Sequence, residues 1–117
     1  MELIKTEFAS KGVVVSRIGG RSENQDCYGF RDTPLGQVVV VCDGMGGIQG
    51  GKVASTIAVN SILGYLASAT EGEDVSRVLI DAIGRANTDI INTGSENPNL
   101  YGMGTTVTVL VLNKTCA

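Results

Sequence analysis

The sequence predicts an α+β fold whose elements follow in the order βββααβ. Two β-prone apolar runs, at residues 37–42 and 104–112, indicate buried strands. Two apolar stripes that repeat about every fourth residue, over 51–69 and 75–90, indicate amphipathic helices. The 16 glycines are about twice the usual share and indicate many tight turns. With 117 residues, the chain is long enough for one hydrophobic core.

The first three strands are expected over residues 12–18, 26–31 and 37–42. Gly19 and Gly20 end the first, and Pro34 and Gly36 suit a hairpin turn between the second and the third. Residues 37–42 are apolar on both faces and mostly β-branched. We therefore expect this strand to be central and covered on both sides.

Two helices and a last strand follow. Residues 51–69 carry the apolar stripe Ala54, Ala58, Ile62 and Leu66, and the acids of 70–74 suit the N-terminus of a second helix. The expected apolar face of that helix consists of Val75, Leu79, Ala82, Ile83, Ala86 and Ile90. Both helices should cover one side of the sheet, and a polar loop at 93–99 should lead to the strand at 104–112. Since no further strand follows to pair with its edge, we expect that the sequence is cut short or that another chain covers the edge.

Composition excludes several classes of function. A net charge of −3 gives no basic face for nucleic acid or an anionic membrane. Neither a signal peptide nor a membrane span is evident, which predicts a cytoplasmic protein, and three cysteines without a CxxC pair suit buried thiols in a reducing compartment. The absence of histidine excludes Ser-His-Asp triads and nearly all zinc hydrolase sites. Chemistry must depend on carboxylates, Arg, Lys and the backbone.

Three polar clusters are candidates for chemistry. Residues 21–26 form a polar run that, taken alone, indicates a charged hairpin turn. Residues 43–47 place Asp43 at the end of an apolar strand, where a buried carboxylate needs a cation or hydrogen-bond donors. Residues 102–106 mark a strand start with glycines, and their threonines need no other role on a half-buried face.

The first two clusters together suit hard-metal chemistry. Asp26 and Asp43 offer the oxygen ligands that Mg²⁺ and Mn²⁺ prefer. Water held between two such ions becomes a nucleophile near neutral pH and can attack phosphorus in line. Arg21 has a planar fork of donors that suits two phosphate oxygens.

Residues 46–52 offer a competing interpretation, because they match the G-x-x-x-x-G-K part of a phosphate-binding P-loop. The next residue is Val53, so the hydroxyl that would bind the Mg²⁺ of a nucleotide is missing. Asp43 at the start of the loop would also repel phosphates unless a metal stood between them. Nucleotide binding is therefore the third hypothesis.

In their order and separation, residues 20–26, 41–47, 51–55 and 102–106 resemble the N-terminal half of the PPM (type 2C) metal-dependent serine/threonine protein phosphatases, bacterial branch. The resemblance implies an αββα four-layer sandwich of antiparallel sheets flanked by helices. Residues 1–117 would form the N-terminal portion of a single phosphatase domain whose C-terminal half is absent. It also implies a two-metal centre with Mn²⁺ or Mg²⁺, a phosphoserine or phosphothreonine protein as substrate, and a serine/threonine kinase system as a partner.

The resemblance assigns roles to individual residues. Asp43 matches the carboxylate that bridges the two metals, and Gly44 matches a glycine whose carbonyl is a ligand. Arg21 matches the arginine that contacts substrate phosphate, and Asp26 matches the aspartate that holds metal-bound water. Gln25 lies where some members have a ligating glutamate.

The later aspartate motifs of the family do not occur in this sequence. The chain alone is therefore expected to be weakly active or inactive in hydrolysing phosphoserine and phosphothreonine. The alternative is a non-catalytic interaction module derived from the phosphatase fold, which would bind a partner, or a second copy, through its exposed strand edge.

Overall fold

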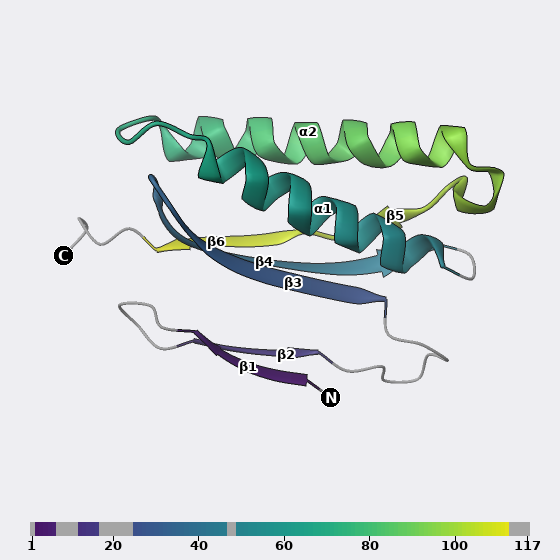
Figure 1. The fold of residues 1–117 in the computed structure, drawn as a ribbon, viewed down its shortest axis with the longest axis horizontal. Helices are drawn as coiled ribbons and strands as arrows, with labels where there is room; N and C mark the ends of the chain where they lie inside the picture. The colour runs from purple at the N-terminus through teal and green to yellow at the C-terminus, as the bar shows by residue number, and fades with distance from the viewer. Residues whose placement is uncertain (1, 7–11, 17–24, 47–48, 113–117) are drawn as a thin grey trace.

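The computed structural model describes residues 2–6, 12–16, 25–46 and 49–112. In chain order the elements are β1 (Glu2–Thr6), β2 (Gly12–Ser16), β3 (Asp26–Thr33), β4 (Gly36–Met45), α1 (Gly50–Ala67), α2 (Val75–Glu96), the 3₁₀ turn η1 (Pro98–Leu100), β5 (Gly104–Thr105) and β6 (Thr108–Leu112). The α+β class is confirmed, with two helices over one face of an antiparallel sheet (Figure 1).

The four-stranded sheet is organised around β4. β3 pairs with one side of β4, and β5 and β6 pair with the other, all antiparallel. Gly44 lies opposite Thr105 and Val41 lies opposite Thr108, so β5 and β6 pair with β4 in the same register. The single strand predicted over 104–112 is therefore present, with an interruption at residues 106–107. β1 and β2 form a separate antiparallel pair. β1 was not predicted, because its sequence ELIKT is short and does not alternate between polar and apolar residues.

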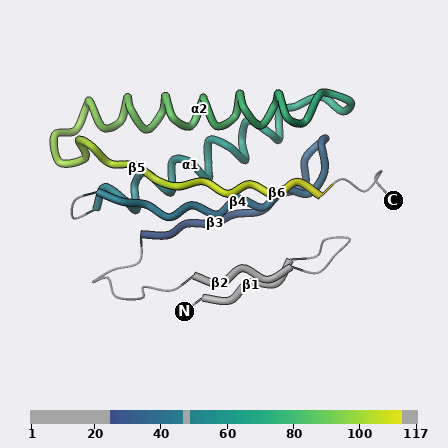
Figure 2. The backbone as a smooth tube through the Cα atoms, turned by 180° about the vertical axis from the view of Figure 1, so that it is seen from behind, coloured from purple at the N-terminus to yellow at the C-terminus, as the bar shows by residue number. Residues whose placement is uncertain are grey.

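The core lies between β4 and the two helices. Val38, Val40 and Cys42 alternate along β4 and are completely buried, as period-2 side-chain alternation requires. α1 contributes its predicted stripe and lies between the sheet and α2 in both views (Figures 1 and 2). The N-terminus of α2 is capped by Asp74, whose side chain accepts a hydrogen bond from the backbone N–H of Ser76 at 3.1 Å.

Three details of the sequence analysis were wrong. Ile83 is 42% exposed, and Val78 is buried in its place, because the face that contacts α1 follows residues 78, 82 and 86. The expected polar loop at 93–99 is partly helical, since α2 continues to Glu96 and ends just before Pro98. β4 is central, but its second face is only partly covered: Val41 is 37% exposed.

Of the helices in the described part of the chain, neither has the combination of length and apolarity that crossing a bilayer requires.

A candidate metal site at the end of the sheet

Two aspartates face each other where β3 begins and β4 ends. Asp26 and Asp43 are direct cross-strand partners. The next pair along the two strands is Gln25 and Gly44. It is hydrogen-bonded, since the N–H of Gly44 donates to the carbonyl of Gln25 at 3.1 Å. Because the two kinds of pair alternate, Asp26 and Asp43 form a non-hydrogen-bonded pair, in which side chains lie closest. Like charges directly opposite are destabilising, so this position favours a bound cation.

The backbone leaves the sheet soon after Asp43, at the end of β4 (Met45). A Cβ atom added to Gly44 would overlap the carbonyl oxygen of Gly51, so only glycine fits at this position. Gly46 has a φ of +130°, which favours glycine as well. The two glycines allow the chain to return within a few residues and begin α1 at Gly50.

The first turns of α1 hold the start of β3. Ser55 is completely buried, and its hydroxyl donates a hydrogen bond to the carbonyl of Gln25 at 2.8 Å. The Nζ of Lys52 donates to the carbonyl of Asp26 at 2.7 Å. In the sequence, Lys52 belonged to the P-loop match and to the 51–55 motif of the family resemblance, but it had no assigned contact. The structure places its ammonium group on the backbone of Asp26.

The other side of β4 contacts the chain near the last strand. The backbone N–H of Asp43 donates to Oγ1 of Thr106 at 3.1 Å, and the N–H of Thr106 donates to the carbonyl of Asp43 at 2.9 Å. The expectation that residues 102–106 start a strand is confirmed, since β5 begins at Gly104. The role of the Thr106 hydroxyl was missed. The sequence signal was a pair of threonines, which is also common on any half-buried strand.

The residues present fit a divalent cation, but only as part of a site. Asp26 and Asp43 lie together, and Gly44 follows Asp43 directly in β4. Oε1 of Gln25 is buried and has no hydrogen-bond partner among the described residues, which suits an atom beside a bound cation or water. Within those residues, however, no group of three or more His, Cys, Asp or Glu side chains could hold a metal. Arg21 lies outside the described residues, so its predicted contact with phosphate stays a prediction.

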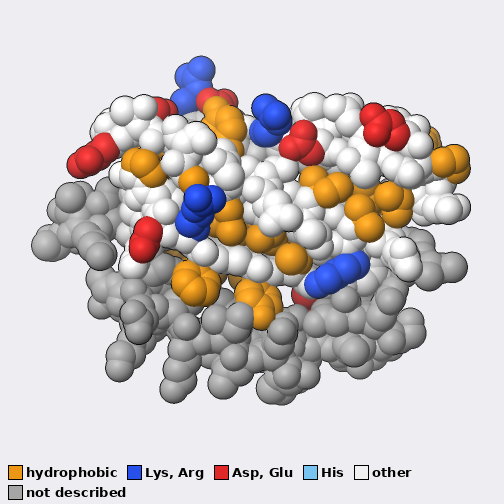
Figure 3. All heavy atoms as spheres, viewed as in Figure 1, with side chains coloured by type: hydrophobic (Ala, Val, Ile, Leu, Met, Phe, Trp, Pro, Cys, Tyr) orange, Lys and Arg blue, Asp and Glu red, His pale blue; other side chains and the backbone are white. Residues whose placement is uncertain are grey.

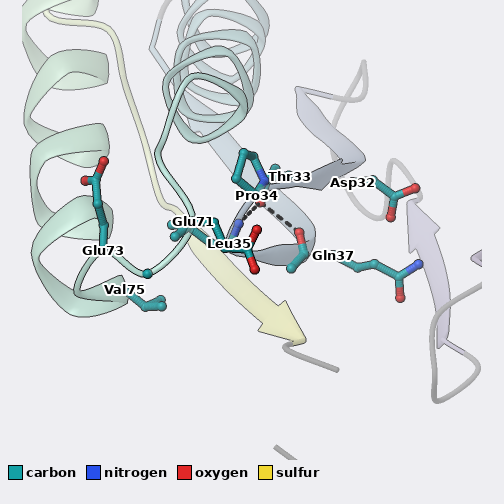
Figure 4. Close-up of a pocket in the computed structure, with 10 residues that line it drawn as sticks. Asp32, Thr33, Pro34, Leu35, Gln37, Glu71, Glu73 and Val75 are labelled. Atoms are coloured by element: carbon teal, nitrogen blue, oxygen red, sulfur yellow. Dashed lines mark hydrogen bonds between the residues drawn. The ribbon is translucent and has the colours of Figure 1, made fainter. Parts of the chain in front are cut away.

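A hollow of about 540 Å³ lies at the opposite end of the sheet, where the turn between β3 and β4 meets the loop before α2 (Figure 4). Thr33 closes this turn by donating from Oγ1 to the carbonyl of Gly36 at 2.7 Å. Seven residue steps separate Thr33 from Asp26 on β3, which is roughly 24 Å. The hollow is lined by the carboxylates of Asp32, Glu71 and Glu73, which would repel phosphate.

Basic side chains are few and separated on the face seen in Figure 3. That face shows no continuous basic surface over the described residues.

Cys42 adjoins Asp43 but points to the core. Burial raises the pKa of its thiol from 9.0 to about 11; the nearby Cys27 also raises it, and a hydrogen bond with Thr105 lowers it. The thiol is therefore protonated near neutral pH and chemically inert. This agrees with the predicted role of a small buried residue.

Comparisons with known proteins agree with this geometry. The family model described as Protein phosphatase 2C matches residues 15–117. The serine/threonine phosphatase stp of Listeria innocua is 31% identical over 96 residues, which cover 79% of this chain and 38% of that protein.

Solved structures give the same result. The serine/threonine phosphatase Stp1 of Staphylococcus aureus superimposes with a TM-score of 0.75 at 27% identity, covering 86% of this chain and 41% of Stp1. The catalytic domain of PstP, solved in complex with two manganese ions, gives a TM-score of 0.70 at 29% identity. The match covers 84% of this chain and 41% of the PstP chain. The chain thus spans about two fifths of the length of these relatives, and its sequence, strand order and helix placement agree with theirs. It belongs to the protein phosphatase 2C family.

Proposed function

We propose that this chain is the N-terminal portion of a single PPM-type phosphatase domain and supplies one side of a two-metal centre that hydrolyses phosphoserine and phosphothreonine in proteins. The observation that carries the proposal is the cross-strand pairing of Asp26 and Asp43 at the end of the sheet. It is supported by the family relationship and by the two manganese ions in the PstP structure.

Each residue near the centre has a distinct role in this proposal. Asp43 would bind both ions, with the Gly44 carbonyl as a further ligand, and Asp26 would hold metal-bound water. Arg21 would orient the substrate phosphate through its two-pronged guanidinium group. Mn²⁺ or Mg²⁺, when bound, would supply an activated water as nucleophile.

The remaining ligands would come from outside the described residues, since these provide only two carboxylates at the site. We accordingly expect this chain by itself to bind metal weakly and to turn over phosphopeptide slowly or not at all. The substrate would be a phosphoprotein of a cytoplasmic serine/threonine kinase system.

The test is a phosphopeptide assay on the 117-residue chain with Mn²⁺, alone and mixed with a polypeptide that carries the later motifs of the family. We expect little release of phosphate from the chain alone, release from the mixture, and loss of that release in the Asp43→Asn variant. Release that Asp43→Asn leaves unchanged would count against the metal site. Robust release from the chain alone, abolished by Asp43→Asn, would overturn the proposal that the site is incomplete.

A second function is supported by the exposed apolar face of the sheet. Phe30 and Leu110 are 48% and 53% exposed on the face opposite the helices. An interaction module that binds a partner chain or a second copy through this face would need no metal. Sedimentation velocity tests it: a chain that stays monomeric at every concentration, with and without a polypeptide carrying the later motifs, would count against this function.

A further inference from the structure

We propose that Thr106 is a positioning residue for Asp43: its hydroxyl takes the place of a backbone carbonyl in the sheet and so fixes where the metal-binding carboxylate lies. This inference rests on the proposed function of Asp43. Thr106 itself would contact neither metal nor substrate.

The hydrogen bonds around Asp43 show the replacement. The register places Asp43 opposite Thr106, and the N–H of Thr106 donates to the Asp43 carbonyl at 2.9 Å, as a regular antiparallel ladder requires. The reverse bond does not follow the ladder, because the N–H of Asp43 donates to Oγ1 of Thr106 at 3.1 Å. The Thr106 carbonyl instead accepts a bond from Oγ1 of Thr105 at 2.9 Å. The interruption between β5 and β6 lies at this position.

The hydroxyl therefore connects the Asp43 backbone to the neighbouring strand. Without Oγ1, the Asp43 N–H would need a water molecule or a shifted strand as its acceptor. In either case the direct bond that fixes the Asp43 backbone at this position would be lost. The Asp43 carboxylate would move with its backbone, and ligand positions tolerate displacements of only about 0.5 Å.

Met103 supports the same part of the turn from the other side. Its side chain is only 8% exposed. A Cβ added at Gly46 would lie 2.9 Å from the Met103 Cα, and one added at Gly50 would lie 3.1 Å from the Met103 Cβ. The turn after Gly44 therefore packs directly on Met103. Residues 103–106 together contact both the Asp43 backbone and the turn from Gly46 to Gly50 that follows β4.

A purely structural role for Thr106 makes a different prediction from a positioning role. If the hydroxyl only stabilised the sheet, its loss would lower the free energy of unfolding and leave the metal affinity of the folded chain unchanged. If it positions Asp43, the folded variant binds metal more weakly.

The experiment is a Mn²⁺ titration of the isotope-labelled chain, followed by the paramagnetic broadening of the backbone amide signals of Asp26, Asp43 and Gly44. This readout requires no catalysis and detects weak binding. Thr106→Val removes the hydroxyl with almost no change of shape, and Thr106→Ser retains it. Thr108→Val is the matched control, since Thr108 is exposed in β6.

We expect Thr106→Val to raise the Kd for Mn²⁺ about tenfold or more, as is typical for residues that orient metal ligands. Thr106→Ser should remain within about twofold of the wild type, and Thr108→Val should have no effect. Hydrogen exchange of the Asp43 amide should become faster in Thr106→Val only. If Thr106→Val fails to fold, Thr106→Ala is measured against Thr106→Ser with trimethylamine N-oxide, which favours the compact state.

Three results would overturn the inference, and they distinguish its failure from that of the proposed function. Equal Kd values for the wild type and Thr106→Val, or equal losses in Thr106→Ser and Thr106→Val, would refute the role of Thr106 alone. If Mn²⁺ leaves the signals of Asp26 and Asp43 in the wild-type chain unbroadened, the proposed metal site fails, and the inference fails with it.

Discussion

Gly44 connects the candidate ligand Asp43 to the start of α1, and it lies where no side chain fits. The Gly51 carbonyl occupies the space that a Cβ would need, while Gly44 donates its N–H to the Gln25 carbonyl. Three backbone segments therefore meet beside the aspartate pair. At the scale of single residues, the site depends on glycines, which let backbone segments come close together, as much as on carboxylates.

Gly44→Ala should therefore destabilise the chain by about 2 to 3 kcal/mol, because two backbone segments would have to separate. Urea unfolding followed by circular dichroism measures this change. Gly64→Ala is the matched control, since nothing lies within 4 Å of a Cβ at this position inside α1. It should stabilise the chain by up to about 1 kcal/mol. Similar effects of the two substitutions would show that the contact with Gly51 is not tight.

Cys42 should make stability depend on pH in the alkaline range. Its pKa is raised to about 11 in the folded chain from an ordinary value of 9.0, so the folded state retains the proton that the unfolded state loses. The stabilisation is fully present below pH 9 and is lost as the pH rises towards 11. Because a tenfold change in proton affinity corresponds to about 1.4 kcal/mol, the expected loss is about 2 to 3 kcal/mol.

The measurement compares urea unfolding of the wild type and Cys42→Ala at pH 8 and at pH 11. The wild type should lose about 2 kcal/mol more than the variant over this interval. Groups far from Cys42 that titrate at alkaline pH are common to both proteins, so their contributions cancel. Equal losses would show that the Cys42 thiol titrates normally in the folded chain.

At the scale of elements, α1 connects the core to the site. Its buried stripe packs on β4 and α2, while its first turns provide the bonds from Lys52 and Ser55 to the start of β3. The spacing of Ala54, Ala58, Ile62 and Leu66 was enough to predict the helix, because burial follows helical periodicity. The contacts of Lys52 and Ser55 were not predictable, since they join residues on different elements.

Ile62→Ala tests how much α1 contributes to the fold. Ile62 is completely buried, so removing its larger side chain should cost about 2 to 5 kcal/mol in the free energy of unfolding. Ile80→Ala on α2 is the control, since Ile80 is 67% exposed, and it should change stability by less than about 0.5 kcal/mol. Equal losses in thermal or urea unfolding would mean that the packing of α1 on the sheet is loose.

At the scale of the whole molecule, the sheet is asymmetric. One face is sealed by α1 and α2, and the other presents partly exposed apolar side chains together with the position of the two aspartates. The family relatives are more than twice as long as this chain. Under the proposed function, the remaining ligands of the metal centre would have to approach the face that carries the two aspartates.

Leu110→Lys tests that surface. We expect the wild-type chain to self-associate at concentrations on the order of 100 µM, because a contiguous exposed apolar face promotes association. Leu110→Lys should remain monomeric, and Ile80→Lys on α2 should associate like the wild type. Sedimentation velocity over a concentration series makes the comparison. Identical behaviour of all three proteins would show that the face does not mediate association.

Much of this organisation was predictable from the sequence. The strands other than β1 and both helices followed from apolar periodicity, and Asp26 and Asp43 from acids beside glycine turns. Gly44 as a candidate ligand followed from the resemblance to the phosphatase family. The direct opposition of Asp26 and Asp43 was not predictable, because it depends on the strand register. The bond between Asp43 and Thr106 was still harder to foresee, since it joins positions 63 residues apart.

That separation also determines the order in which the site can form during synthesis. Asp26 and Asp43 belong to one hairpin with a short turn, and hairpins form within about 1 to 10 µs once their residues are free. A ribosome that adds about 5 to 20 residues per second needs roughly 3 to 13 s to extend the chain from Asp43 to Thr106. For those seconds the nascent chain holds two opposed carboxylates without the strand that fixes them.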